Sequence, residues 1–128
     1  MADQFNMSGD FRGAIINIKS TLNSVQQSVG EISTTDENAR KELERLIGQL
    51  SEMLQKIPAE KQEQAQAVAE TAKALVDTAK AEKPNNTMLQ ITGEGLKQAA
   101  KNLAEVMPTV VTIAGQIVMA VSKLVIGV

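Results

Sequence analysis

The C-terminal third of the chain carries apolar residues at a spacing of seven, and this spacing constrains the fold more than any other feature. The apolar series is Leu89, Leu96, Leu103, Val110, Ile117 and Leu124. Intermediate positions are filled by Thr92, Ala99, Val106, Ile113 and Ala120. Alternating steps of three and four residues place such a set along one face of an α-helix. The sequence therefore predicts helix over residues 87–128 in a single register.

The predicted helix is too long for a compact domain unless it breaks. At 1.5 Å per residue it would extend about 60 Å, whereas the earlier helical segments would extend roughly 30–36 Å. Pro108 removes the backbone hydrogen bond to Ala104 and crowds that turn, so it is a candidate hinge. Gly115 is a second hinge candidate. We expect a kink at Pro108, with a full chain reversal that splits the helix in two as the alternative.

Three more helices are predicted, over residues 11–32, 35–57 and 59–82. The first has an apolar stripe at helical spacing, formed by Phe11, Ile15, Ile18, Leu22, Val25, Val29 and Ile32. Within it, the β-branched segment GAIINIKST allows a short strand as a competing interpretation. Thr34 with Glu37, and Thr87 with Gln90, have the spacing of capping boxes. Residues 1–10 are expected to be a flexible N-terminus. The predicted fold is one all-α domain over residues 1–128, an up-and-down four-helix bundle with a long, kinked last helix.

Composition excludes most chemistry. The chain has no cysteine and no histidine, which removes thiol nucleophiles, disulfides and the commonest general base and metal ligand. Aromatic residues make up 2% and the net charge is −2, without the basic face of a nucleic-acid binder. We therefore expect no enzymatic activity, no cofactor, no metal and no nucleic-acid partner. The start of the sequence lacks the basic and apolar regions of a signal peptide, and a cytoplasmic location is the expectation.

Two interpretations of the C-terminal segment Met107–Val128 remain open. Seventeen uncharged residues, Val106–Ser122, approach a membrane-spanning length and are followed by Lys123. Against insertion, Thr112 and Gln116 lie off the apolar series, as on a helix with one hydrated side. Burial in a bundle or oligomer is favoured, and membrane association is the alternative.

The N-terminal segment Phe5–Leu22, FNMSGDFRGAIINIKSTL, resembles a Gly-Asp-Phe motif next to helical effector or adaptor domains of bacterial signalling and conflict proteins. The matching residues are Ser8, Gly9, Asp10, Phe11, Gly13, Ala14, Ile15, Ile16, Asn17 and Ile18. The resemblance implies a domain that passes signals by assembling with copies of itself, with membrane disruption as a possible output.

These observations lead to one functional hypothesis and one alternative. The hypothesis is a non-enzymatic helical module that associates with itself, or with another helical protein, through the apolar series. The alternative is a membrane-active effector, pore-forming or anchored, that uses Met107–Val128.

Overall fold

The structure, a computed structural model, describes the backbone of residues 2–32, 36–81 and 84–126, and the side chains from residue 16 onward up to residue 125 within these ranges. Over these ranges the chain forms five α-helices and one short 3-10 helix. Their bounds are α1 Ala2–Glu31, α2 Glu37–Leu54, η1 Ala59–Lys61, α3 Gln62–Ala79, α4 Asn86–Lys101 and α5 Pro108–Ile126. The all-α prediction is confirmed. The prediction of four main helices is not, because the segment predicted as one long last helix contains two helices, α4 and α5.

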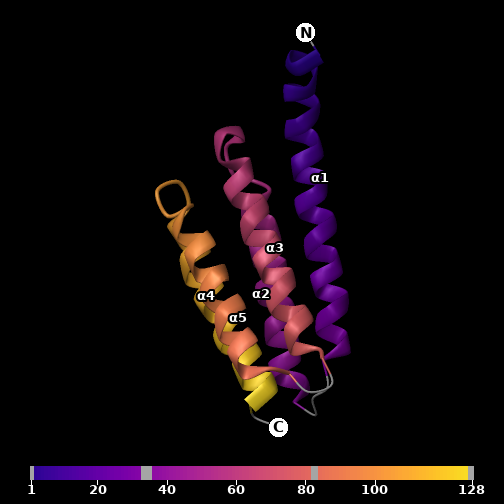
Figure 1. The fold of residues 1–128 in the computed structure, drawn as a ribbon, viewed down its shortest axis with the longest axis vertical. Coiled ribbons are helices and arrows are strands. Elements are labelled where there is room, and N and C mark those ends of the chain that lie inside the picture. The colour runs from indigo at the N-terminus through magenta and orange to yellow at the C-terminus, as the bar shows by residue number, and fades with distance from the viewer. Residues whose placement is uncertain (1, 33–35, 82–83, 127–128) are drawn as a thin grey trace.

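Successive helices run in opposite directions along the long axis of the molecule (Figure 1). α2 and α3 lie between α1 on one side and the α4–α5 pair on the other. α1 packs against both α2 and α3, α2 packs against α5, and α3 packs against α4. α4 and α5 also pack against each other. The five helices therefore form a closed set in which each has two extensive neighbours.

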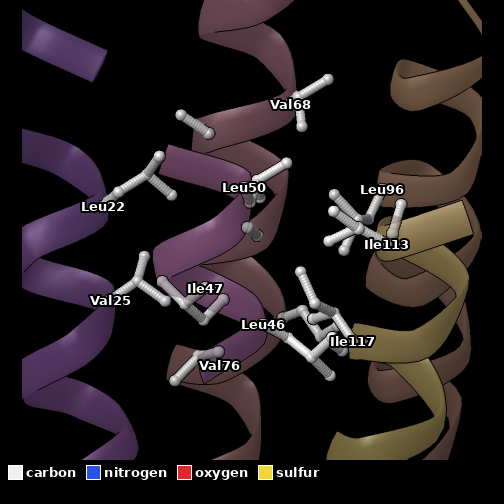
Figure 2. Close-up of a cluster of buried hydrophobic side chains, with 14 of the residues drawn as sticks. Leu22, Val25, Leu46, Ile47, Leu50, Val68, Val76, Leu96, Ile113 and Ile117 are labelled. Atoms are coloured by element: carbon white, nitrogen blue, oxygen red, sulfur yellow. The ribbon is translucent and has the colours of Figure 1, made fainter. Parts of the chain in front are cut away.

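All five helices contribute to one hydrophobic core. Figure 2 shows Leu22 and Val25 of α1 pointing toward the middle layer from one side. Ile113 and Ile117 of α5 point toward the same layer from the opposite side. Among the described side chains, the buried members of this core are all aliphatic, so its packing depends on the fit between neighbouring helices.

The first helix is longer than predicted. α1 has 30 residues and begins at Ala2, so it includes residues 2–10, which were expected to precede the first helix. Gly9 and Gly13 each cost a helix only about 1 kcal/mol and keep its backbone hydrogen bonds, so they do not end it. The strand interpretation of GAIINIKST is wrong, because this segment lies inside α1. A strand would place Ile16 and Ile18 on one face, yet Ile16 is 65% exposed and Ile18 is fully buried.

Pro108 marks a chain reversal instead of the expected kink. α4 ends at Lys101, a turn follows, and α5 begins at Pro108 and packs back on α4. At the first position of a helix, proline loses no hydrogen bond, so the reversal avoids the penalty that a kinked helix would carry. It also buries apolar side chains on both sides of the turn, and each such burial contributes about 1.5–3 kcal/mol.

Helix ends also differ from the predicted ones. α4 begins after Asn85, whose Oδ1 accepts a hydrogen bond from the backbone N–H of Met88 at 3.1 Å, so Thr87 is not the cap. α2 begins after Asp36, which accepts from the N–H of Ala39 at 3.0 Å. The predicted cap Thr34 lies outside the described residues, as do the side chains of Phe11 and Ile15.

Candidate interaction surface

The apolar series predicted to mediate association lies mostly inside the molecule. Five of its members are at most 1% exposed: Leu96, Leu103, Val110, Ile117 and Leu124. Leu89, at the start of the series, is partly buried against the same core. In this fold the series is therefore covered by the chain itself, and it offers no surface to an intact second copy. Any surface for a partner has to be sought among the exposed residues.

Charged side chains form ion pairs on α1, α2 and α3. The Lys80 ammonium lies 3.1 Å from a Glu31 carboxylate oxygen and 3.7 Å from Asp77, and so joins α1 to α3. The hydrogen bond to Glu31 raises the pKa of Lys80, partly opposed by desolvation. On α2, the hydrogen bond from Arg45 lowers the pKa of Glu42. These exposed pairs are typical of a solvated surface.

α5 presents a different surface. No charged residue occurs from Pro108 to Ser122. Its exposed residues over this stretch, here called the α5 face, are Pro108, Thr109, Thr112, Gln116, Met119 and Ser122. Met119 is 71% exposed. Lys123 follows it by one turn on the same helix. A large apolar side chain at this exposure is a feature of surfaces that bind other proteins.

A groove of about 450 Å³ lies beside the α5 face, between α4 and α5. Its lining residues are Asn86, Leu89, Gln90, Gly93, Glu94, Lys97, Val118 and Ser122. A Cβ added to Gly93 would lie 3.2 Å from Val118 Cγ1, so the glycine is what lets the two helices approach closely here. The groove combines apolar side chains from both helices with one weak ion pair, Lys97 to Glu94 at 3.9 Å.

Charged chemistry in the groove is limited to one pair of side chains. Its two charged groups are a lysine and a glutamate that pair with each other across one helical turn. Among the described residues, no group of three or more acidic side chains is placed to hold a metal ion. The groove thus presents apolar side chains from two helices beside one ion pair.

Met119 and Val118 were not singled out by the sequence, although a signal for Met119 exists. Met119 follows Thr112 and Gln116 at steps of four and three, so it shares the face that lies off the apolar series. Met119 is therefore an apolar residue on the face that the sequence predicts to be hydrated, and this mismatch marks it as a candidate contact residue. The groove could not be predicted in this way, because it depends on the reversal that brings α5 beside α4. Of the two predicted hinges, Pro108 lies at the reversal, and Gly115 lies inside the uninterrupted helix α5.

Within the described part of the chain, no helix has both the length and the hydropathy required to cross a membrane. No protein-family model, curated protein or solved structure matches this chain.

Proposed function

We propose that the chain is a non-enzymatic helical interaction module that associates with a second copy of itself through the α5 face and the adjoining groove. The observation that carries the proposal is Met119, 71% exposed on a helix without charge from Pro108 to Ser122. Protein interfaces are enriched in methionine and depleted in lysine, glutamate and aspartate at their centres. The resemblance of Phe5–Leu22 supports a setting in bacterial signalling or defence.

A two-fold arrangement suits this surface, because the exposed Met119 side chain and the groove belong to the same side of the helix pair. In a symmetric dimer each copy presents the same patch, so the Met119 side chain of one copy can enter the groove of the other. The groove offers Leu89 and Val118 as apolar contacts for the methionine side chain. The flexible thioether of methionine fills such irregular gaps well.

The first experiment compares Met119→Glu with Ile16→Glu by light scattering over a range of protein concentrations. Both substitutions place a carboxylate at a strongly exposed apolar position, since Ile16 is 65% exposed, but Ile16 lies on α1. Met119→Glu should weaken association at least about tenfold, because an unpaired carboxylate would be buried in the interface. Ile16→Glu should leave the mass unchanged. A wild-type chain that stays monomeric at every concentration would contradict the proposal.

Membrane action by Met107–Val128 is the alternative function. Ile117 and Leu124 are buried in the core, so α5 would have to leave the bundle before its apolar side could meet lipid. Dye release from phosphatidylcholine–phosphatidylglycerol vesicles tests it. A lysine at Gln116, which is exposed in the fold and lies near the middle of Met107–Val128, should abolish release without disturbing the core, since a charge at the centre of a membrane helix costs about 3 kcal/mol. Release by the wild type and loss in Gln116→Lys would favour this alternative.

A further inference from the structure

The apolar series continues in one register across a turn that does not require it. Two helices joined by a reversal can each bury any face, so nothing in a hairpin keeps Leu103 and Val110 seven residues apart. A continuous helix over residues 86–126 does require this spacing, because all its members must lie on one face. The same residues therefore satisfy two arrangements, the observed hairpin and a single long helix.

The turn between α4 and α5 is close to helical already. Asn102, the residue that follows α4, has φ −67° and ψ −14°, in the right-handed helical region. The backbone N–H of Leu103 donates to Ala100 O at 2.9 Å, and the N–H of Met107 donates to Leu103 O at 2.8 Å. No described residue of the chain has a positive φ, so the reversal lacks the left-handed glycine or asparagine that commonly ends a helix.

Pro108 is the residue that most opposes a continuous helix. The turn otherwise contains residues that favour helix, among them Leu103, Ala104 and Glu105. A proline in a helix interior costs about 3 kcal/mol, whereas at the first position of α5 it costs nothing. The closed hairpin is thus favoured by one side chain and by the burial of α5 against its own chain.

We propose that α4 and α5 can open at residues 102–107 into one helix, and that two copies of the chain then exchange their α5 helices. In the exchanged dimer, the α5 of one copy occupies the place of α5 in the other, against α2 and α4. Each buried contact of Val110, Ile117 and Leu124 is then formed again between copies, so the exchange costs little core energy.

The direction of the helices allows this exchange. α4 runs toward the end of the molecule that carries the turn, and α5 runs away from it (Figure 1). When α5 continues straight on from α4, it enters a second copy placed end to end and related by a two-fold axis near the turn. There it has the same direction as the α5 it replaces. The N-terminal part of α1 projects beyond its neighbours at this same end, where the second copy would lie.

This exchange goes beyond the proposed docking of intact copies, and the two have different tests. In the hairpin, Gln90 and Ser122 line one groove, whereas in a continuous helix they would be about 48 Å apart. Both are exposed, and the chain has no cysteine of its own, so spin labels can be attached to Gln90→Cys/Ser122→Cys. Labelled chain refolded with excess unlabelled chain reports only the distance within one copy.

The decisive variant is Pro108→Ala. It should raise the association constant for dimerisation about a hundredfold or more, measured by light scattering. It should also lengthen the distance between the labels at residues 90 and 122 from the short distance of the hairpin to about 48 Å. Inserting Gly-Ser-Gly-Ser between Glu105 and Val106 in the same background should return the association constant for dimerisation to its wild-type value and restore the short label distance, because a longer flexible connection favours the hairpin. Met119→Glu should leave the exchanged dimer intact.

Two results would overturn the exchange. One is a Pro108→Ala chain, helical by circular dichroism, that remains monomeric at high concentration. The other is a Pro108→Ala dimer that retains the short label distance, which would mean that closed copies dock face to face. The second result would leave the proposed function standing while removing the exchange.

Discussion

At the scale of single residues, Gly93 of α4 and Gly115 of α5 have opposite surroundings. A Cβ added to Gly115 would have no neighbouring atom within 4 Å, whereas one added to Gly93 would lie 3.2 Å from Val118. Gly115→Ala should raise the free energy of unfolding by about 1 kcal/mol, because alanine favours helix and nothing obstructs it. Gly93→Ala should raise the free energy of unfolding by less, because the Val118 side chain must move to make room for the new Cβ. Urea unfolding of both variants measures the difference.

The outcome at Gly115 also tests its predicted role as a hinge. If α5 has to bend there, Gly115→Ala will destabilise the fold or block association, contrary to the expectation above. The sequence places both Gly115 and Pro108 inside one predicted helix, with Pro108 as the expected break and Gly115 as a second hinge candidate. The two differ because a proline imposes a geometric constraint, whereas a glycine only lowers helix propensity and yields to tertiary packing.

At the scale of elements, each of α2 and α4 begins after a residue whose side chain caps the helix, and local geometry determines which residue this is. Residues 85–87, Asn-Asn-Thr, offer three capping side chains in a row, and the structure uses Asn85. Asn85→Ala should lower the free energy of unfolding by about 1 kcal/mol, because the N–H of Met88 loses its acceptor. Thr87→Ala should have little effect or slightly stabilise α4. Thermal and urea unfolding of the pair checks this. A larger loss for Thr87→Ala would restore the predicted capping box.

The buried face of each helix could be predicted well from the sequence, but which helices pack against each other could not. The stripe Ile18, Leu22, Val25 and Val29 is buried as its spacing indicates, and so are five members of the C-terminal series. Spacing fixes which face of a helix is buried, but it does not say what covers that face. For the C-terminal series the choice lay between this chain, a copy of it and lipid. In this structure the chain itself covers the series, through a reversal at Pro108 that periodicity alone cannot distinguish from a kink.

At the scale of the whole molecule, the core is one connected cluster although the helices form three layers. Its buried members come from α1 at one side and α5 at the other, with α2 and α3 between them. The number of helices was predicted as four because the sequence marks loops through proline, glycine and asparagine, and the turn at residues 102–107 contains none of these except Asn102. A connected core implies that the outer layers unfold together with the middle one.

Core truncations at the two sides of the molecule test this cooperativity. Leu22 on α1 is 1% exposed and Ile117 on α5 is fully buried, so replacement of either by alanine leaves a cavity. Each variant should lose about 2–5 kcal/mol of unfolding free energy. Because both positions belong to one cluster, urea unfolding followed by circular dichroism should remain a single transition with an unchanged slope. A second transition or a lower slope in Leu22→Ala alone would show that α1 unfolds separately, as a layer attached to a core formed by the other four helices.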